Sequence, residues 1–461
     1  MNPEERLREI REQIADKTRI IVEEFCQRLI LAKEVAALKT QLNLPIEDYQ
    51  IEKKLTQQIR NICVKNNIDP KLGLKLLNIL ISTSISIQKA ATNKPLITPT
   101  TIFEETRRLE EQGAKIIHLE VGEPDFGPPQ RVIDATIKAL KEGRTHYTSK
   151  YGIPELRRAL ANRLSERWHT SIAPYETIVT PGGRAALTLA LSTILNQGDS
   201  AIIFEPAWPA YKNCVESLGC RARVVSTTME NDWQPEVSQI EDLIDETTKV
   251  ILVNSPCNPT GKVLSRKVLK SIINIAAKHN ITIVSDEAYT EFSYRNRYSL
   301  LQEDCRKIVL GTFSKAWGMT GFRLGYIIAP KEICDAISEI AGEFYTSVPE
   351  PIQVAGLTAL ECFNEVDKYV ALMKRRLETV LTLLKPLPIT FKEPDGAFYI
   401  FFKLKDPISG EEFVEQLLKK HHVALTPGSS FGRYQSFVRF SFCRPEEELR
   451  EGVARMREFL L

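Results

Sequence analysis

A lysine, a carboxylate, an amide and an arginine stand at informative positions in the second half of this sequence. Lys315 lies within Gly-Thr-Phe-Ser-Lys-Ala-Trp-Gly-Met-Thr-Gly-Phe-Arg, Asn258 and Asp286 precede it, and Arg323 follows it by eight residues. A lysine amine can form an imine with a carbonyl compound, but one lysine among 61 lysines and arginines carries no information. The four residues together predict a Schiff-base lysine beside a bound, phosphorylated ring.

Asp286 and its neighbours could hold such a ring. The run Ile-Thr-Ile-Val-Ser before Asp286 predicts a buried parallel strand, and ligands bind at the carboxyl ends of such strands. A carboxylate there can pair with a protonated pyridine nitrogen, which keeps the ring able to accept electrons. Tyr289 and Asn258 could donate hydrogen bonds to a phenolic oxygen of the ring. A helix cap or a turn would also explain Asp286 or Asn-Pro-Thr-Gly taken singly.

A phosphate site is predicted where a glycine turn meets a helix. The stretch Ile-Val-Thr-Pro-Gly-Gly-Arg-Ala, which contains Gly183 and Arg184, predicts a strand, a turn and a helix start, and helix N-termini bind anions. The Thr312 hydroxyl and the Arg323 guanidinium could serve the same phosphate. Trp208 could stack on the ring, although a tryptophan is more often part of a core. Ring, imine and phosphate contacts together indicate pyridoxal 5'-phosphate.

From about residue 95 to 461 the sequence resembles the class I/II aminotransferases of fold type I, which include aspartate and aromatic aminotransferases. The resemblance implies an α/β fold with a large domain around a mostly parallel sheet and a second, small domain. It also implies that the residues quoted above form a pyridoxal-phosphate site, in which the cofactor contacts are Lys315, Asp286, Tyr289, Asn258, Trp208, Gly183, Arg184, Thr312 and Arg323.

The same resemblance implies how an amino acid is bound. Arg439, in Phe-Val-Arg-Phe-Ser-Phe, and Gly122, in Leu-Glu-Val-Gly-Glu-Pro-Asp, would hold the substrate carboxylate near Trp208 and Asn258. Lys315 would then move a proton to and from the substrate α-carbon. Tyr147, in Thr-His-Tyr-Thr-Ser-Lys-Tyr-Gly, matches a tyrosine that reaches the phosphate of the neighbouring subunit, so a homodimer is expected.

The first 92 residues differ in composition, since they are rich in charged residues and poor in glycine. Their apolar residues recur at helical spacing. The pattern predicts one long helix from Pro3 to Thr40, about 55 Å in length, and so long a helix needs a partner. Two shorter helices are predicted, one opening near Asp48 and one at Asp69-Pro70, where an acidic N-cap precedes proline.

Polar residues on these predicted helices share faces in pairs, which are Arg28 with Lys39, Asp48 with Glu52, and Ser84 with Gln88. Arg11 is turned about 100° away from Arg28, so it cannot easily serve the same site from the same helix. A solvated, charged helix face would explain any one of these residues alone.

Taken together with Arg11, these six residues resemble the site of the all-helical chorismate mutases, in which the long helices of two subunits intertwine. The resemblance implies that Arg28 and the other subunit's Arg11 clamp the two carboxylates of chorismate. Lys39 and Gln88 would donate to the ether oxygen that gains charge as its bond breaks, and Glu52 would accept the ring hydroxyl, in a site that Asp48 and Ser84 complete. Ile51 stands where the family usually has an arginine. A purely dimerising or regulatory domain is the alternative.

The whole chain has the composition of a soluble globular protein, with 43% hydrophobic and 26% charged residues. A formal net charge of +2 gives no electrostatic reason to expect nucleic-acid or membrane partners, and small-molecule substrates are expected instead. No metal pattern is present, and nine scattered cysteines favour reduced thiols in a cytoplasm. A change in composition predicts a helical domain over 1–92, a linker over 93–101 and a second part over 102–461. The resemblance to aminotransferases implies that this part has a large domain over about 136–344 and a small domain over about 102–135 plus 345–461.

Three hypotheses follow for function. The first is a bifunctional enzyme of aromatic amino-acid biosynthesis that turns chorismate into prephenate and transfers an amino group to prephenate or an aryl-pyruvate. The second is a general aspartate-type aminotransferase whose helical domain senses ligands or dimerises. The third is a noncatalytic regulator built on an aminotransferase body, which the intact Lys315, Asp286 and Arg439 argue against.

Overall fold

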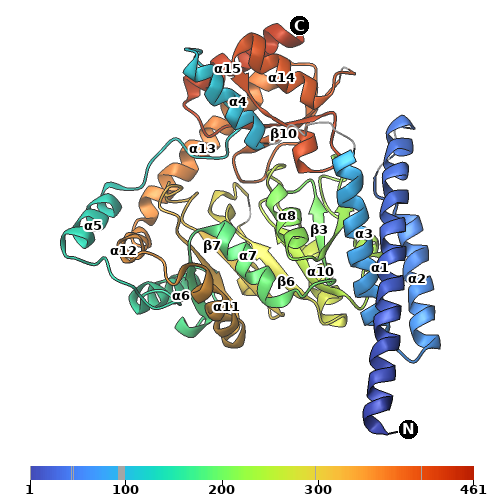
Figure 1. Cartoon of the computed structure of the whole chain (residues 1–461). Coiled ribbons are helices and arrows are strands. Elements are labelled where there is room, and N and C mark those ends of the chain that lie inside the picture. The colour runs from blue at the N-terminus through green and yellow to red at the C-terminus, as the bar shows by residue number, and fades with distance from the viewer. Residues whose placement is uncertain (1, 43, 45, 92–98, 296, 406) are drawn as a thin grey trace.

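The computed structural model describes residues 2–42, 44, 46–91, 99–295, 297–405 and 407–461. An all-helical N-terminal part stands beside a larger α/β part, as Figure 1 shows. This is the predicted fold class. Most of the predicted linker, 93–101, lies outside the described residues, and its last three residues belong to the first turn of α4 (Pro99–Glu111).

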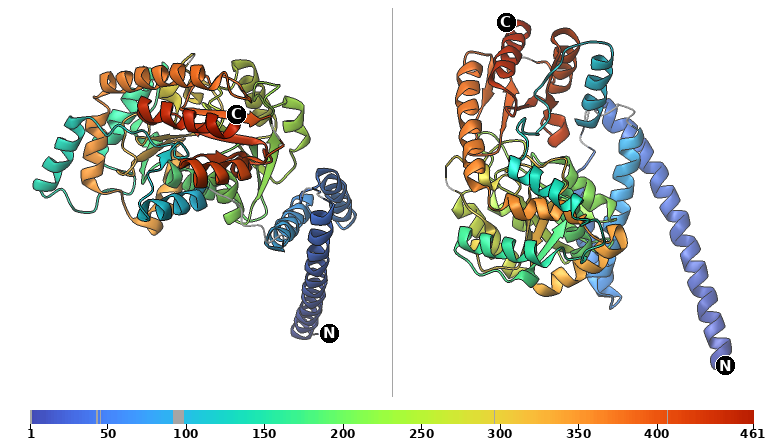
Figure 2. Two further views of the ribbon diagram at one scale, coloured as in Figure 1. Left: turned by 90° about the horizontal axis from the view of Figure 1, so that it is seen from above. Right: turned by 90° about the vertical axis from the view of Figure 1, so that its left-hand side faces the viewer.

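The helical part consists of α1 (Pro3–Gln41), α2 (Tyr49–Lys65) and α3 (Pro70–Ala91). Asn2 and Glu5 form a capping box at the start of α1, and the Asp48 carboxylate accepts the backbone N–H groups of Gln50 and Ile51 at the start of α2. The predicted helix starts at Pro3, Asp48 and Pro70 are thereby confirmed. The first turn of α1 projects away from the rest of the molecule (Figure 2).

Helix α3 connects the helical part to the α/β part and lies between α1 and the central sheet in both views of Figure 2. One of its faces buries Leu74, Leu77 and Ile81 against the other helices. Asn78 lies next to this face, and its amide donates to the Gly198 carbonyl at 2.9 Å and the Thr247 hydroxyl at 3.1 Å. Because these acceptors belong to loops beside the sheet, the helical part is docked through buried polar contacts.

The large sheet has the strand order β2-β8-β7-β6-β5-β3-β4, and β8 alone among these seven runs antiparallel to its neighbours. The strands are β2 (Thr177–Thr180), β3 (Ser200–Glu205), β4 (Arg221–Ser226), β5 (Thr248–Asn254), β6 (Thr282–Asp286), β7 (Lys307–Thr312) and β8 (Gly325–Ile328). Alternate residues enter two separate cores. Ile203 and Leu252 pack toward α7 (Gly183–Ile194) and α8 (Pro209–Ser217), whereas Ile202 and Ile251 pack toward α10 (Arg266–Lys278). Helices cover both faces, which explains why the strands read as continuous apolar runs.

The helices of this part are α5 (Gln130–Lys141), α6 (Pro154–Trp168), α7 (Gly183–Ile194), α8 (Pro209–Ser217), α9 (Val237–Asp242), α10 (Arg266–Lys278), α11 (Lys331–Tyr345) and α12 (Glu350–Ala359), with short 3-10 turns at Pro174–Glu176, Thr290–Phe292 and Leu300–Gln302. Helix α7 follows β2 after two residues, and α8 follows β3 after three residues. These short connections bring helix N-termini to the carboxyl edge of the sheet.

A smaller layer is built from both ends of the α/β segment. Its four-stranded antiparallel sheet has the order β12-β13-β10-β9, and β1 pairs with β11 in a separate two-stranded parallel sheet. The elements are β1 (Ile117–His118), β9 (Ile389–Phe391), β10 (Tyr399–Leu404), β11 (Val423–Ala424), β12 (Thr426–Pro427), β13 (Phe437–Ser441), α13 (Phe363–Leu384), α14 (Gly410–His421), α15 (Glu446–Leu460) and a 3-10 turn at Gly428–Phe431. The β1–β11 pairing places the loop after β1 against the large sheet.

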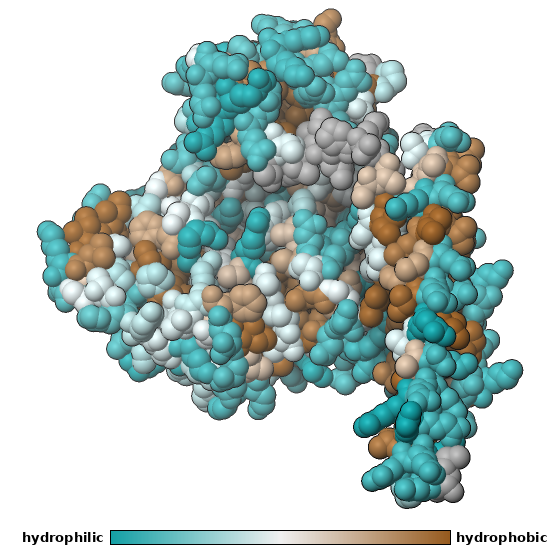
Figure 3. All heavy atoms as spheres, viewed as in Figure 1, coloured by the Kyte–Doolittle hydropathy of each residue, from teal (hydrophilic) through white to brown (hydrophobic). Residues whose placement is uncertain are grey.

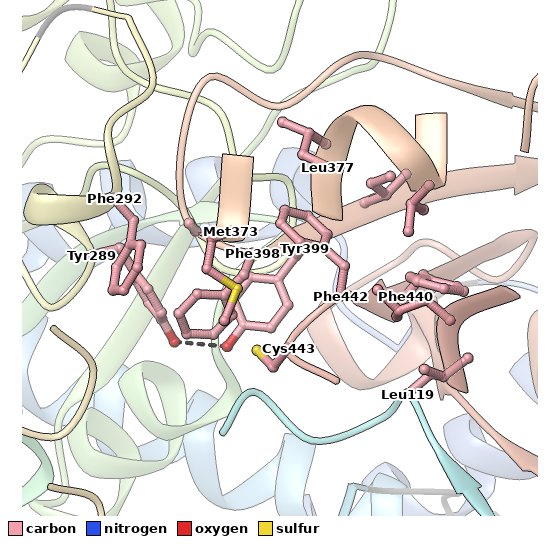
Figure 4. Packing of buried hydrophobic residues seen from close by; sticks show 14 of the residues in the cluster. Leu119, Tyr289, Phe292, Met373, Leu377, Phe398, Tyr399, Phe440, Phe442 and Cys443 are labelled. Atoms are coloured by element: carbon pink, nitrogen blue, oxygen red, sulfur yellow. Dashed lines mark hydrogen bonds between the residues drawn. The ribbon is translucent and has the colours of Figure 1, made fainter. Parts of the chain in front are cut away.

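Aromatic side chains fill the space between the two layers, as Figure 4 shows. Tyr289 and Phe292 come from the loop after β6, and Phe398 and Tyr399 come from the start of β10. Their rings meet edge to face, with Tyr289 and Phe398 centroids 5.3 Å apart. The packing fixes the position of β10 relative to the carboxyl edge of the large sheet.

A buried ion pair holds the loop that carries Gly122. The Arg376 guanidinium on α13 binds both carboxylate oxygens of Asp125, each at 2.7 Å. Arg376 is 7% exposed and Asp125 is 18% exposed, so the pair is largely shielded from solvent. Removing one partner would leave a buried charge uncompensated.

Replacing Arg376 by alanine is therefore expected to lower the free energy of unfolding of the α/β part by about 3 kcal/mol. Urea unfolding followed by tryptophan fluorescence measures this change, because all four tryptophans lie in that part. Arg375→Ala is the matched control, since Arg375 is exposed on the same helix. Equal destabilisation by the two variants would contradict the assignment.

Candidate active sites

The start of α7 forms a concave, electropositive turn at the carboxyl edge of the sheet. Gly182 has a φ of +87°, and a Cβ at this position would lie 2.5 Å from Nη2 of Arg323. Glycine is therefore needed for the guanidinium to approach the turn. A Cβ on Gly183 would lie 3.5 Å from the Thr312 side chain at the end of β7. The turn, the hydroxyl and the guanidinium thus lie together, as predicted for a phosphate site.

Asp286 ends the central strand β6 and is buried. Its carboxylate accepts the Tyr211 hydroxyl at 2.8 Å and the Ala288 N–H at 3.0 Å. Burial raises the pKa of Asp286, although these hydrogen bonds and the Lys315 charge oppose the shift. A cationic ring nitrogen beside the carboxylate would favour its charged form. The sequence did not predict Tyr211 as a site residue, although Tyr211 lies only three residues after the predicted Trp208.

Lys315 lies just beyond β7, and its Nζ donates to the Gly122 carbonyl at 2.7 Å. Burial lowers the pKa of Lys315, and nearby arginines act in the same direction. A Cβ on Gly122 would lie 1.8 Å from the Tyr399 hydroxyl oxygen, so only glycine fits there. The lysine amine is consequently held against a backbone carbonyl in a partly buried position.

Other predicted side chains come from both layers, with Tyr289 and Asn258 on loops of the large sheet and Arg439 on the small one. The Tyr289 and Tyr399 hydroxyls share a hydrogen bond of 2.8 Å, drawn as a dashed line in Figure 4. On β13, Arg439 donates to the Asn258 amide oxygen at 2.8 Å and to the Thr426 hydroxyl at 3.3 Å. It also donates to the backbone carbonyl of Glu120. A guanidinium held by neutral acceptors in this way remains suited to a substrate carboxylate.

Tyr399 and Phe431 were absent from the sequence-based set, yet their rings lie 4.6 and 4.9 Å from the Arg439 guanidinium carbon. Such stacking orients the guanidinium plane. Arg184 extends over the Trp208 ring, with its guanidinium carbon 5.1 Å from the ring centroid. Tyr147 is 88% exposed in the single chain and does not join the cluster.

These residues fit pyridoxal phosphate. Gly183, Thr312 and Arg323 would hold the phosphate, Asp286 would face the ring nitrogen, and Tyr289 with Asn258 would face the ring oxygen. When bound, the cofactor supplies an electron sink for a carbanion. Lys315 is the only group of this set that can carry a proton as an amine, and Arg439 with Gly122 would orient the substrate carboxylate. We refer to this set as the cofactor site.

The predicted polar residues Arg28, Lys39, Glu52, Ser84 and Gln88 lie on α1, α2 and α3, and we refer to this set as the helical site. The Arg28 guanidinium bridges to α3 by donating to the Leu80 carbonyl at 2.7 Å and to the Ser84 hydroxyl. Lys39 Nζ donates to the Ile46 carbonyl at 2.6 Å. The Gln88 amide oxygen is buried and has no hydrogen-bond partner among the described residues. Such an orphan acceptor belongs where a ligand or water completes the bonding.

Asp48 and Arg11 lie outside this set, and Glu52 of the set contacts the α/β part. Asp48 serves as the cap of α2. Glu52 forms an ion pair with Arg221 of β4, a contact between the two parts that the sequence did not predict. Burial raises the pKa of Glu52, and the charge of Arg221 opposes this shift. Ile51 is 59% exposed. Arg11 lies about 25 Å along α1 from Arg28 and does not reach the cluster within one chain.

Comparisons with known proteins agree with both parts of the fold. The family model for aminotransferase class I and II matches residues 114–456, and the one for chorismate mutase type II matches residues 10–89. An aspartate aminotransferase of Thermotoga maritima is 36% identical over 358 residues, covering 77% of this chain and 94% of that protein.

Solved structures give the same result. A crystal structure of aspartate aminotransferase from Thermotoga maritima matches with a TM-score of 0.76 and 36% identity, covering 79% of this chain and 97% of that chain. One of an aromatic aminotransferase from Pyrococcus horikoshii OT3 matches with a TM-score of 0.73 and 32% identity, covering 77% and 98%.

The chain therefore belongs to the class I and II aminotransferases, which depend on pyridoxal phosphate, and carries a chorismate mutase type II domain before them. Among the residues that the structure describes, none of the helices has the length and hydropathy needed to cross a bilayer. The same residues contain no group of three or more His, Cys, Asp or Glu side chains suited to a metal ion.

The lowered pKa of Lys315 predicts how the protein without cofactor takes up pyridoxal phosphate. Below that pKa the amine is protonated and unreactive, so a depressed pKa extends the reactive neutral form to lower pH than in an exposed lysine. The rate of cofactor uptake, followed by the absorbance of bound cofactor, is expected to decrease as the pH is lowered. This decrease should begin only at pH values below those at which an ordinary exposed lysine becomes protonated. Lys315→Ala should develop no such band, whereas Lys374→Ala, at an exposed position, should match the wild type.

Proposed function

We propose that this chain is a bifunctional enzyme of aromatic amino-acid biosynthesis. The helical site rearranges chorismate to prephenate, and the cofactor site transfers an amino group from glutamate or aspartate to prephenate or an aryl-pyruvate. The observation that carries the proposal is that one chain holds two separate polar clusters of the types these two reactions need. The nine free cysteines favour a cytoplasmic setting.

Rearrangement of chorismate requires positioning and charge stabilisation rather than bonding to the protein. In the helical site, Arg28 is the cation nearest Ser84 on α3 and would bind a carboxylate of chorismate. Lys39 would turn from its backbone carbonyl to the ether oxygen, and the orphan Gln88 amide would complete that contact. Glu52, whose pKa is raised by burial, is suited to the neutral ring hydroxyl.

At the cofactor site, Lys315 would remove the proton from the substrate α-carbon and return it on the opposite half-reaction. Its lowered pKa supports this role, because a base must be neutral at the working pH. Arg439 and the backbone at Gly122 would fix the carboxylate, so that the α-carbon faces the lysine.

A general aspartate-type aminotransferase is the second candidate, and the names of the relatives favour it. The Thermotoga maritima protein is called an aspartate aminotransferase, and this chain covers 94% of it with only 77% of its own length. In that case the helical part would sense a ligand or join subunits without turning over chorismate.

Separate variants distinguish these candidates. Lys39→Ala is expected to abolish chorismate turnover and leave transamination intact, whereas Lys315→Ala should do the reverse, because the two clusters share no residue. Absorbance of chorismate and release of the keto product of glutamate report the two activities. Prephenate, phenylpyruvate and oxaloacetate offered together as acceptors identify the substrate; exclusive use of oxaloacetate would support the second candidate.

We further propose a homodimer in which each helical site receives Arg11 from the partner. Apolar side chains remain exposed along α1, including Ile14 and Ile21, each 60% exposed. Figure 3 shows hydrophobic surface among hydrophilic residues on the helical part. Tyr147, 88% exposed, would likewise reach the cofactor site of the partner. The exposed apolar residues of α1 and the exposed Tyr147 thus both favour a homodimer.

Complementation tests the sharing of Arg11. Arg11→Ala and Lys39→Ala variants, each inactive alone as a mutase, are unfolded and refolded together. Half of the randomly paired dimers are mixed and hold one intact site of two, so turnover is expected to recover to about a quarter of the wild-type value. Refolding each variant alone is the control. Absence of recovery in dimers of verified mixed composition would exclude an Arg11 supplied by the partner.

A further inference from the structure

A continuous groove of about 1910 Å³ runs between the helical part and the α/β part. Lys39 and Glu52 of the helical site line it on one side, and Trp208 and Arg184 of the cofactor site line it on the other. Residues from α1, α2, α3, β3, β4 and α8 therefore face a single space. Lys39 and Glu52 on one wall and Arg184 and Trp208 on the other thus border one groove rather than separate surfaces.

Ion pairs between the helical part and the α/β part hold the two walls of the groove in fixed relative positions. Arg221 of β4 pairs with Glu52 of α2, and Lys212 of α8 pairs with Glu47 at 3.1 Å. Farther along α2, Arg60 pairs with Glu246 at 2.8 Å. Because Arg221 and Lys212 are mostly buried, these pairs are better shielded than ordinary surface ion pairs. The distance between the two sites is fixed by the fold.

Basic side chains outnumber acidic ones along the groove. Among the described residues the lining holds nine basic side chains, Lys39, Lys53, Arg60, Lys89, Arg184, Lys212, Arg221, Arg223 and Arg433, and six acidic ones, Glu47, Glu52, Glu205, Asp242, Asp245 and Glu411. Burial raises the pKa of Glu52 and of Glu205, whereas the pKa values of Glu47 and Asp245 are lowered because Lys212 and Arg223 outweigh the effect of burial. The surplus of basic side chains therefore sets the sign of the groove. A cleft lined with one prevailing charge concentrates ligands of the opposite charge.

We propose that this groove carries a dianionic dicarboxylate from the helical site to the cofactor site of the same chain before it escapes to solvent. The inference rests on the proposed function, in which the product of the first reaction is the amino acceptor of the second. Such a product keeps its two carboxylates through the rearrangement. Lys39 lies at the start of the path, Arg433 is exposed on its wall, and Arg184 over Trp208 lies at its end.

The experiment follows the appearance of aminated product after chorismate and glutamate are added to the full-length protein with its cofactor. For each protein, the rates of the two reactions measured separately give the lag expected if prephenate passes through bulk solvent. Transfer through the groove predicts an observed lag well below that calculated one. An equal mixture of Lys39→Ala and Lys315→Ala proteins must show the full calculated lag, since transfer between separate molecules is forced through solvent.

Arg433→Glu tests the charge of the path, and Arg375→Glu is the matched control because Arg375 is an exposed arginine on α13, outside the groove. In Arg433→Glu the ratio of observed to calculated lag is expected to rise toward one, and added salt should have the same effect on the wild type. The control should keep the wild-type ratio.

A wild-type lag equal to the calculated value would overturn the groove proposal even where both separate reactions proceed. Failure of prephenate to accept an amino group when supplied alone would instead overturn the proposed function, and the groove proposal with it. The separately measured rates distinguish these two outcomes.

Discussion

The burial of the Asp286 carboxylate at the end of the central strand β6 is the constraint around which the α/β part is organised. A carboxylate removed from water is costly unless it is hydrogen-bonded or faces a cation. The Tyr211 hydroxyl and the Ala288 N–H meet part of this demand. A protonated pyridine ring would supply the remaining stabilisation of the Asp286 carboxylate. The phosphate turn, Lys315 and the Tyr289 hydroxyl accordingly surround the place where such a ring would bind.

The small layer completes this arrangement from the other side. Tyr399 fills the space above Gly122, touches the Tyr289 hydroxyl and supports the Arg439 guanidinium. One side chain thereby links the lysine loop, the ring-oxygen partner and the carboxylate-binding arginine. The Arg376–Asp125 pair holds the Gly122 loop from behind. Substrate orientation is thus a property of the contact between the layers.

The helical part is joined to the aminotransferase part by more than the connecting segment. Asn78 on α3 is buried against the Gly198 and Thr247 loops, and Glu52 on α2 pairs with Arg221. A residue expected to contact chorismate is therefore held by the neighbouring part of the chain. This arrangement ties the geometry of the helical site to the edge strand β4 of the large sheet.

The sequence by itself determined the elements and the chemistry that depend on near neighbours. Asn2 and Asp48 capped their helices, Pro70 opened α3, and the strand before Asp286 ended at the carboxylate. These features rest on hydrogen bonds and periodicity within a few residues, so their signals are local. The motifs around Lys315 and Arg439 likewise pointed to one cofactor.

Only the tertiary structure decided which distant side chains meet. Tyr211 reaches Asp286 across 75 residues, Tyr399 reaches Tyr289 across 110, and Arg221 reaches Glu52 across 169. These contacts depend on the order of strands in the sheet and on the docking of α3 at its edge. Hydrophobic periodicity does not specify either, because a buried strand or helix face reads the same whichever neighbour covers it.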